Sequence, residues 1–344
     1  MSTSLSPRWS GDRAMGMAAA RQLRIGVVGA GGIAHSHLSA WQRLGATVRV
    51  WSVDGRGAEV GARYGAGFAD DLADLIDGSD VVDVCTPTWT HPEIVHAAAA
   101  AGRHVICEKP LALTHGSAEG MIAACTDAGV QLHPAQVVRY FGEYAAAERL
   151  VRAGRIGTPA VLRLSRRSAA PVAAWFADPT LSGGIMVDQM IHDFDYARWI
   201  AGEVDCAYAR TVPGLRGALT AFVVLRHSSG ALSHLVGAWA GPDEVFATSF
   251  SLAGSAGLLR HSSAASTAVT WTGVTDARAG EVIPGGTTQR SPFDEELAEF
   301  AAAVAGGPAP RVSASDGLAA LDIALAAVRS AELGRPVEVG EVAQ

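Results

Sequence analysis

The sequence predicts an α/β protein of two domains, a doubly wound parallel sheet followed by an α+β domain with a large, mostly antiparallel sheet. Up to about residue 143, short apolar runs alternate with helical stretches, as in parallel sheets that are covered on both faces. Beyond that point, long strand-like runs joined by turns dominate. A chain of 344 residues is also long for one hydrophobic core and comfortable for two.

The composition describes a well-packed globular protein, with 49% hydrophobic and 18% charged residues. A formal net charge of −7 offers no basic surface to nucleic acid or to an anionic membrane. No apolar run reaches the ~18 residues that a bilayer span requires. The four cysteines lack metal-ligand spacing, so we expect reduced thiols, no bound metal and a cytoplasmic protein.

The N-terminal segment carries no signal-peptide core, and we expect a disordered tail over residues 1–21. The parallel domain is predicted over residues 22–143. Its right-handed crossovers place the ligand crevice at the carboxyl ends of the strands. The expected strands are 23–29, 48–53, 81–86, 104–108 and 130–138, and the expected helices are 33–44, a second one ending near residue 62, 91–101 and 117–128.

The second domain is predicted over residues 144–344, and its C-terminal segment could pack back on the first domain. Ser228-Ser229-Gly230 is a turn signal between two strand-like runs and predicts an antiparallel hairpin. Residues 261–267 are either a loop or a short strand. The other expected elements are helix 145–152, strands 160–168, 218–227, 231–240 and 245–253, and helices 292–304 and 315–333.

A glycine-rich turn follows the first strand, with Gly29, Gly31, Gly32, Ile33 and Ala34 in the pattern Gly-x-Gly-x-x-Ala. Strand, glycine turn and helix in this order are the fingerprint of a dinucleotide site. Gly29 permits the tight turn, and Gly31 lets the backbone approach a pyrophosphate. The amides at the start of the helix then bind the phosphates. The alternative, a turn that binds nothing, is disfavoured by the flanking strand and helix.

An acidic residue, Asp54, lies about 20 residues beyond this fingerprint, where a carboxylate holds a ribose 2′-hydroxyl. Ser52 and Arg56 are close by and could instead accommodate a 2′-phosphate. We therefore expect NAD, while NADP stays open. Thr86 and His91 flank the end of the third strand, and they could contact the cofactor or cap the helix that follows.

Lys109 follows a strand within the tripeptide Glu108-Lys109-Pro110. A lysine at the carboxyl end of a strand in such a sheet points into the ligand crevice. There its cation can hydrogen-bond a substrate hydroxyl and favour a developing alkoxide. The alternative is an exposed surface lysine, which is the default for a single lysine.

The segment after Gly183-Gly184 reads as the start of a helix that carries Asp188 and His192 at positions i and i+4, on one face. A carboxylate beside an imidazole suits general acid–base chemistry, although a helix cap and a partly buried histidine would give the same pattern. Asp193 points to another face. Asp195 could also reach His192, so spacing alone leaves Asp188 and Asp195 open.

Four arginines could contact an anionic or polar substrate. Arg139 follows the fifth strand and could bind substrate or form a salt bridge between domains. Arg163, Arg166 and Arg167 lie in a predicted strand, where they could meet an anionic substrate group or line an exposed sheet face. Because neighbouring residues of a strand face opposite sides, at most one of Arg166 and Arg167 enters the crevice.

Taken together, these motifs resemble the Gfo/Idh/MocA family of NAD(P)-dependent sugar and cyclitol oxidoreductases. The resemblance covers nearly the whole chain after Leu23, through residues 26–34, 85–91, 104–112, 154–157 and 183–195. It implies a Rossmann domain joined to a substrate-binding sheet domain whose open face packs against another subunit. We therefore expect an NAD-dependent enzyme that forms a homo-oligomer, either a dimer or a tetramer.

The resemblance also implies that Lys109, Asp188 and His192 form the catalytic group, with Glu108 near the nicotinamide. These three residues and Arg139 are the expected substrate contacts. The expected reaction interconverts a secondary ring hydroxyl and a ketone on a sugar or cyclitol, and His192 takes the hydroxyl proton. Two alternatives are an NAD-dependent glycosidase that uses transient oxidation and a non-catalytic sensor that binds dinucleotide and sugar.

Overall fold

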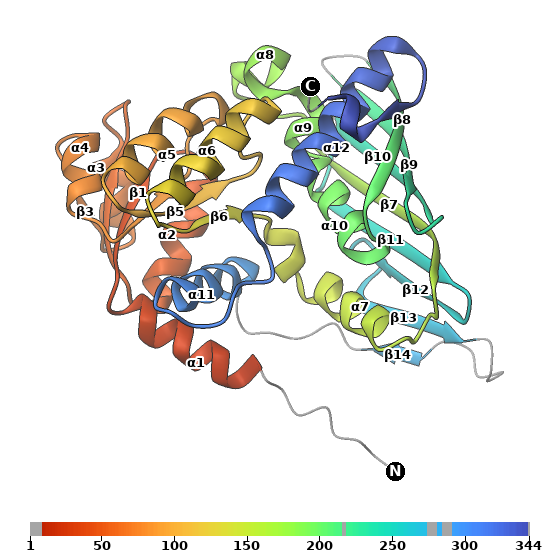
Figure 1. The fold of residues 1–344 in the computed structure, drawn as a ribbon, viewed down its shortest axis with the longest axis horizontal. Coiled ribbons are helices and arrows are strands. Elements are labelled where there is room, and N and C mark those ends of the chain that lie inside the picture. Colours follow the sequence, from red (N-terminus) through yellow and green to blue (C-terminus); the bar gives the residue numbers. More distant parts are fainter. Residues whose placement is uncertain (1–8, 215–217, 274–280, 284–290, 343–344) are drawn as a thin grey trace. The chain divides into compact units, whose positions relative to one another are not determined.

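The structure, a computed structural model, describes residues 9–214, 218–273, 281–283 and 291–342. These residues form two compact units (Figure 1). The first unit takes in the described parts of Met1–Glu108, Glu119–Tyr140 and Gln289–Ala314, and the second those of Lys109–Ala118, Phe141–Thr288 and Ser315–Gln344. Within the described part of the chain, no helix is both long and apolar enough to cross a membrane.

The first unit is built on a six-stranded parallel sheet in the order β3-β2-β1-β4-β5-β6. This order confirms the predicted doubly wound fold, in which β1 and β4 lie side by side at the point where the strand order reverses. The short strand β3 has too few residues to give a sequence signal. The strands are β1 (Arg24–Val28), β2 (Thr47–Trp51), β3 (Gly67–Phe68), β4 (Val81–Val84), β5 (His104–Glu108) and β6 (Leu132–Ala135).

Helices follow these strands along the chain, and those after β1, β2, β4 and β5 lie close to the predicted positions. The helix after β1 starts at the glycine-rich turn and ends at Gly45, whose φ of 78° favours glycine. The helices and 3₁₀ turns of this part of the chain are α2 (Gly32–Leu44), α3 (Gly57–Arg63), α4 (Leu72–Asp77), η1 (Thr88–Thr90), α5 (His91–Ala100), α6 (His115–Asp127) and η2 (Val137–Tyr140).

The N-terminal segment contains a helix, α1 (Trp9–Ala20), which packs against α11 (Pro292–Val304) (Figure 1). The two backbones approach closely, since a Cβ at Gly16 would lie 2.3 Å from the backbone oxygen of Ala298. The prediction of a disordered tail is therefore wrong for residues 9–20. Small apolar residues give little sequence signal, but they pack well against a helix from a distant part of the chain. Residues 1–8 lie outside the described part.

The second unit contains a nine-stranded sheet in the order β14-β13-β12-β11-β7-β10-β9-β8-β15. All neighbours are antiparallel except β7 and β10, which confirms the mostly antiparallel sheet. The stretch around residues 261–267 takes in the end of β12 and the start of β13. The strands are β7 (Pro159–Ala169), β8 (Val204–Pro213), β9 (Leu219–His227), β10 (Leu232–Ala240), β11 (Ala247–Gly254), β12 (Gly257–Ser262), β13 (Ser266–Gly273), β14 (Glu281–Ile283) and β15 (Val337–Glu338).

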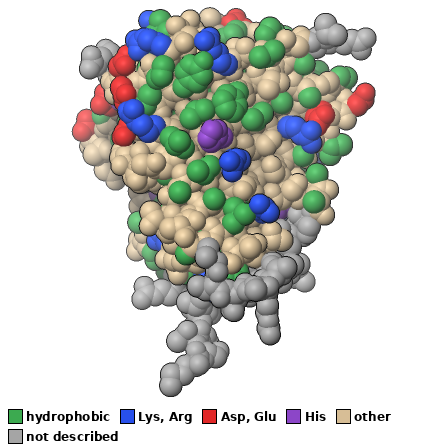
Figure 2. Space-filling model, turned by 90° about the vertical axis from the view of Figure 1, so that its right-hand side faces the viewer, with side chains coloured by type: hydrophobic (Ala, Val, Ile, Leu, Met, Phe, Trp, Pro, Cys, Tyr) green, Lys and Arg blue, Asp and Glu red, His purple; other side chains and the backbone are tan. Residues whose placement is uncertain are grey.

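Helices cover one face of this sheet, and the other face is open (Figures 1 and 2). Strand β7 shows the two environments, because Arg166 is buried on the helix side while Arg163 and Arg167 are exposed on the other. The predicted opposition of Arg166 and Arg167 is thus confirmed. The helices are α7 (Gly142–Arg152), η3 (Ala174–Ala177), α8 (Pro179–Ser182), α9 (Gly184–Asp188), α10 (Ile191–Ala201), α12 (Ala314–Leu333) and η5 (Val339–Glu341).

Candidate functional site

The glycine-rich turn of the first unit has the geometry of a ligand cradle. Gly29 has a φ of 114°, and a Cβ there would lie 2.6 Å from the backbone oxygen of Cys85, so the fold itself requires glycine. At Gly31 and Gly32, by contrast, a Cβ would meet nothing within 4 Å. The protein's own packing therefore does not require glycine at these two positions, and the open space is available to a ligand.

The start of α2 supplies hydrogen-bond donors at this cradle. Its N-cap, Gly31, has no side chain that could satisfy the first amides of the helix, which include that of Ile33. Ala34 is completely buried, as close packing of the helix on the sheet demands. Exposed amides at a helix N-terminus bind phosphate well, so these residues fit the pyrophosphate of a dinucleotide.

A hollow of about 350 Å³ lies at the ends of β2 and β3, within the same unit, and Ser52, Gly55 and Gly57 are among its lining residues. Asp54 stands beside it and accepts hydrogen bonds from Ser52 Oγ at 2.8 Å and Arg56 Nε at 2.6 Å. These bonds lower the pKa of Asp54. An ionised carboxylate at this strand end suits the hydroxyls of a ribose.

Thr86 and His91 lie at the end of β4, as predicted, and they contact each other. His91 is completely buried, and its Nε2 donates to the backbone oxygen of Thr86 at 2.9 Å. Thr86 Oγ1 accepts from the hydroxyl of Thr90 at 2.7 Å. His91 therefore holds the shape of the loop after β4, a role that the sequence did not distinguish from direct cofactor contact.

Lys109, Asp188 and His192 belong to the second unit, and two of them form an ion pair. Lys109 Nζ donates to the backbone oxygen of Asp188 at 2.5 Å and lies 3.2 Å from Asp188 Oδ1. Both side chains are mostly buried, with exposed fractions of 16% and 17%. A partly buried ion pair is screened less by solvent than a surface pair, so the lysine is held in one place.

The chain between Asp188 and His192 is not one continuous helix. Helix α9 ends at Asp188, a turn follows, and α10 begins at Ile191. The expectation of one shared helix face is therefore wrong, because a break between α9 and α10 replaces the i to i+4 stacking. Among the described residues, His192 Nδ1 is buried without a hydrogen-bond partner, so Asp188 does not hold that nitrogen.

The environment of His192 favours a neutral imidazole. Burial lowers the pKa of His192 well below its usual value, and the cations Lys109 and Arg166 lower it further. A histidine in this state is unprotonated at neutral pH, so it is available to take a proton from a substrate that is bound beside it. The group formed by Lys109, Asp188 and His192 can therefore act as a cation next to a neutral base.

A buried ion pair that the sequence did not reveal stands beside His192. Arg166 of β7 donates from Nε and Nη2 to the two carboxylate oxygens of Asp193, at 2.9 and 3.0 Å. Both residues are nearly completely buried. Gln189 strengthens the arrangement, since its Nε2 donates to the backbone oxygen of Arg166 at 3.1 Å. The pair fastens the first turn of α10 to the sheet and thereby fixes the position of His192.

Arg139 has a packing role in the structure rather than the predicted role in substrate binding. Its side chain is 2% exposed, and Nη1 donates to the backbone oxygen of Arg311 at 2.7 Å. Arg311 returns a bond to the backbone oxygen of Arg139 at 3.3 Å. The 3₁₀ turn η2 directs this arginine into the first unit, where it joins η2 to the segment after α11.

Glu108, at the end of β5, is 5% exposed and belongs to the first unit. Its Oε1 lies 3.0 Å from His37 Nε2. His37 comes from α2, directly after the glycine-rich turn. The residue before Lys109 is thus tied to the helix that starts the dinucleotide cradle, a link that the sequence analysis missed.

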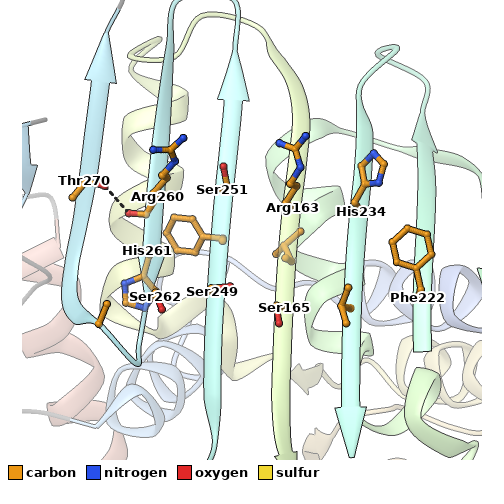
Figure 3. Close-up of a pocket in the computed structure, with 14 residues that line it drawn as sticks. Arg163, Ser165, Phe222, His234, Ser249, Ser251, Arg260, His261, Ser262 and Thr270 are labelled. Atoms are coloured by element: carbon orange, nitrogen blue, oxygen red, sulfur yellow. Dashed lines mark hydrogen bonds between the residues drawn. The ribbon is translucent and has the colours of Figure 1, made fainter. Parts of the chain in front are cut away.

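The open face of the second sheet carries a hollow of about 630 Å³ (Figure 3). Pairing of the strands places Arg163, Ser251 and Arg260 side by side on β7, β11 and β12. Among the described residues, neither arginine has an ion-pair partner. Exposed Phe222 and Val236 lie on the same face, and Figure 2 shows hydrophobic and basic side chains mixed over it. Such a mixture is typical of protein interfaces.

The glycines allow a test that separates folding from binding. Gly29→Ala should lower the free energy of unfolding by about 1–3 kcal/mol, because the added Cβ meets backbone and φ is strained. Gly31→Ala, the matched control, should keep stability within about 0.5 kcal/mol yet weaken dinucleotide binding. Urea unfolding and titration calorimetry measure the two effects. Full stability in Gly29→Ala, or full binding in Gly31→Ala, would contradict this description of the turn.

The buried pair of Arg166 and Asp193 gives a second prediction. Arg166→Met leaves a buried carboxylate without its partner and should cost about 3–5 kcal/mol of stability. Arg166→Met combined with Asp193→Asn should recover much of this loss. Arg167→Met, next in sequence and half exposed, should cost less than about 0.5 kcal/mol. Urea unfolding of the four proteins distinguishes these outcomes, and equal losses in the two single arginine variants would refute the role of the pair.

Comparison with known proteins follows the same division of the chain. The family model described as "Oxidoreductase family, NAD-binding Rossmann fold" matches residues 23–136. The model described as "GFO/IDH/MocA C-terminal domain" matches residues 144–260. Together the two models span more than half of the chain.

Relatives match nearly the full length. Myo-inositol 2-dehydrogenase of Thermotoga maritima is 34% identical over 93% of this chain and 99% of its own. The crystal structure of a probable dehydrogenase from Thermotoga maritima has a TM-score of 0.78 at 32% identity, covering 93% of this chain and all of the other. An oxidoreductase from Agrobacterium radiobacter, crystallised with NAD⁺, L-tartaric acid and magnesium, has a TM-score of 0.79 at 26% identity, with 93% and 99% covered. The chain therefore belongs to the GFO/IDH/MocA family of oxidoreductases, and its first domain is an NAD-binding Rossmann domain.

Proposed function

We propose that the protein is a dehydrogenase that interconverts a secondary ring hydroxyl and a ketone on a sugar or a cyclitol. The proposal is carried by the buried Nδ1 of His192 and the nearby Lys109–Asp188 ion pair, because burial and the cations Lys109 and Arg166 lower the pKa of this imidazole. A base of this kind is what alcohol oxidation needs, because the hydroxyl proton must leave as the carbon is oxidised. The name of the Thermotoga maritima relative, myo-inositol 2-dehydrogenase, supports a cyclitol as the first substrate to test.

His192 is the proposed general base. Its Nδ1 is the buried nitrogen, which leaves Nε2 as the atom that takes the proton from the substrate hydroxyl. The pair of Arg166 and Asp193 holds the imidazole at its place at the start of α10. In the reverse direction, the same nitrogen returns the proton to the forming alcohol.

Lys109 is the proposed electrostatic catalyst. Its ammonium group donates to the substrate oxygen and stabilises the negative charge that develops as the proton leaves. Asp188 orients the lysine through its carboxylate and its backbone oxygen. Bound NAD supplies the acceptor for the hydride of the carbinol carbon. The Lys109–Asp188 pair and His192 then act on the same hydroxyl from two sides.

The proposed cofactor residues all belong to the first unit. The backbone at Gly29, Gly31, Gly32 and Ile33 would hold the pyrophosphate, and Asp54 the adenosine ribose. A carboxylate repels a 2′-phosphate, which favours NAD over NADP. Arg56 bonds to Asp54, so it would have to leave that carboxylate before it could bind a phosphate. Thr86 and Glu108 are the proposed contacts at the ends of β4 and β5, with His91 supporting Thr86.

Removing the base tests this function directly. His192→Ala should lower kcat for NAD reduction by myo-inositol by roughly 10²–10⁴ and leave NAD affinity unchanged. In the wild type, oxidation should stay constant from neutral pH down past the usual histidine value of about 6.5. It should fall only as pH drops through the lowered pKa, because the base must be unprotonated. Absorbance of reduced nicotinamide measures both the kcat of His192→Ala and the pH profile of the wild type.

Lys109→Met is the companion variant. It removes one cation that lowers the pKa of His192, so the acid limb of the rate profile should move to higher pH. Full activity of His192→Ala would eliminate His192 as the base. An acid limb that does not move in Lys109→Met would eliminate the electrostatic coupling between the two residues.

We further propose that the open face of the second sheet joins two copies of the chain in a homo-oligomer. The mixed apolar and basic surface around Phe222, Val236, Arg163 and Arg260 supports this assembly. The expected stoichiometry is a dimer or a tetramer. Acidic side chains, which Figure 2 shows toward the rim of this view, would complement the arginines of the other copy.

Phe222→Lys should weaken the oligomer, because it places a charge in the proposed apolar contact. Leu333→Lys at the end of α12 is the matched control, since Leu333 is exposed to the same extent as Phe222, 41% against 40%. Light scattering over a concentration series should show a lower mass for Phe222→Lys alone. A monomeric wild type, or an unchanged mass in Phe222→Lys, would reject the proposed interface.

A further inference from the structure

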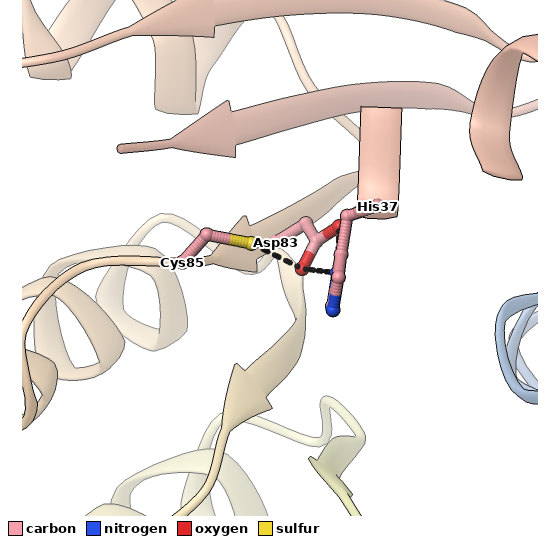
Figure 4. Close-up of side chains that lie close together, drawn as sticks. All are labelled: His37, Asp83 and Cys85. Atoms are coloured by element: carbon pink, nitrogen blue, oxygen red, sulfur yellow. Dashed lines mark hydrogen bonds and ion pairs between the residues drawn. The ribbon is translucent and has the colours of Figure 1, made fainter. Parts of the chain in front are cut away.

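A buried cluster in the first unit joins α2 to the central strands of the sheet. The potential donor atoms of His37, Asp83 and Cys85 lie within 4.8 Å of one another (Figure 4). Hydrogen bonds account for this spacing, because Asp83 accepts from His37 Nδ1 at 3.0 Å, from Trp41 Nε1 at 2.8 Å and from Cys85 Sγ at 3.6 Å. The Asp83 carboxylate therefore accepts three hydrogen bonds, and the cluster is a hydrogen-bonded network.

The second nitrogen of His37 extends the network to Glu108, whose Oε1 lies 3.0 Å from Nε2. His37 and Asp83 are completely buried. Burial disfavours the charged imidazole, but its neighbours, Asp83 first and Cys85 second, raise the pKa of His37 well above its usual value. Because both ring nitrogens face carboxylates, His37 is a cation that donates to Asp83 on one side and to Glu108 on the other.

Two further groups near His37 contribute no charge. Glu296 of α11 is completely buried, and neither of its oxygens has a hydrogen-bond partner among the described residues. Burial raises the pKa of Glu296 well above its usual value, so this carboxyl is protonated. Burial also raises the pKa of Cys85 to about 12. Two carboxyl groups, those of Asp83 and Glu108, therefore face the single imidazole of His37.

Glu108, at one end of this network, lies at the half of the sheet where the nicotinamide belongs. The dinucleotide crosses the sheet at the β1–β4 switch point, with one mononucleotide over each half. Asp54 and the hollow at the ends of β2 and β3 mark the adenosine half. The nicotinamide half is then that of β4, β5 and β6, and Glu108 is the last residue of β5.

We propose that the chain Asp83–His37–Glu108 makes the first domain prefer oxidised over reduced cofactor, by fixing an ionised carboxylate at the nicotinamide half. The inference rests on the proposed function, in which the two cofactor forms exchange during turnover. The oxidised nicotinamide ring is a cation and the reduced ring is neutral. The charge of a mostly buried carboxylate is weakly screened, so it attracts the cationic oxidised ring more strongly than the neutral reduced ring. His37 is a positioning residue that acts through Glu108.

The test is the ratio of the dissociation constants of NAD⁺ and NADH, measured by titration calorimetry on the full chain. Glu108→Gln removes the charge but keeps an oxygen for His37, and it should weaken NAD⁺ relative to NADH by about tenfold. Glu119→Gln is the matched control, because Glu119 is an exposed carboxylate of the same unit. It should leave the ratio unchanged. Thermal melting verifies that each variant is folded.

The variant His37→Gln tests whether the charge of His37, and not only its packing, controls the ratio of the two dissociation constants. In the wild type the ratio should be constant through neutral pH, because His37 stays a cation there. Without that cation, two buried carboxylates face each other, and the preference for NAD⁺ should fall as pH decreases. Loss of packing alone would weaken both cofactor forms equally at every pH. If His37→Gln does not fold, Asp83→Asn, which still accepts from Trp41, replaces it. Loss of Asp83 removes the main charge that raises the pKa of His37, so the ratio should again become dependent on pH.

Three results would each contradict a different part of the proposal. Failure of the wild type to bind either cofactor form would reject the proposed function together with the inference. Binding of both forms with an unchanged ratio in Glu108→Gln would reject only the inference. A ratio that rises in Glu108→Gln but is independent of pH in His37→Gln would reject the network and leave Glu108 acting alone.

Discussion

The ion pair between Lys109 and Asp188 is the contact on which the proposed active site depends. It joins two segments that lie 79 residues apart in the sequence, the one that follows β5 and the one that ends α9. The pair holds a cation close enough to His192 to lower its pKa. Without it, the electrostatic catalyst would have no defined position, and His192 would lose the nearby charge of a fixed lysine that lowers its pKa. The break between α9 and α10 turns Asp188 toward the lysine rather than toward His192.

Two buried charge networks support this arrangement, one in each unit. Arg166 and Asp193 fasten the start of α10 to the sheet of the second unit. His37 links Asp83 to Glu108 in the first unit, and Glu108 directly precedes Lys109. Buried ion pairs add little net stability, but the loss of one partner is costly. The networks therefore act by fixing the positions of the side chains near them. Proton and hydride transfer require reacting groups that are held in defined positions.

Much of the fold and part of the site followed from local patterns in the sequence. The glycine-rich turn and the helix after it are local features, so the turn lies between β1 and α2, and Asp54 follows β2, as the sequence predicts. The alternation of strands and helices also gives the parallel sheet directly. The partners of side chains are not local. A contact such as Arg166 with Asp193, or α1 with α11, depends on packing between distant segments. The inward turn of Arg139 and the interruption between Asp188 and His192 have the same origin.

In the proposed reaction an alcohol carbon gives up hydride while His192 takes the proton, and an isotope label at that carbon follows the hydride. Myo-inositol deuterated at its ring carbons would be incubated with NAD and the protein, and the reduced cofactor analysed by mass spectrometry. Direct hydride transfer from the ring carbon to NAD would give reduced cofactor that carries one deuterium, with a ketone as the other product. Loss of deuterium to solvent without net cofactor reduction, or reduced cofactor without the label, would contradict it.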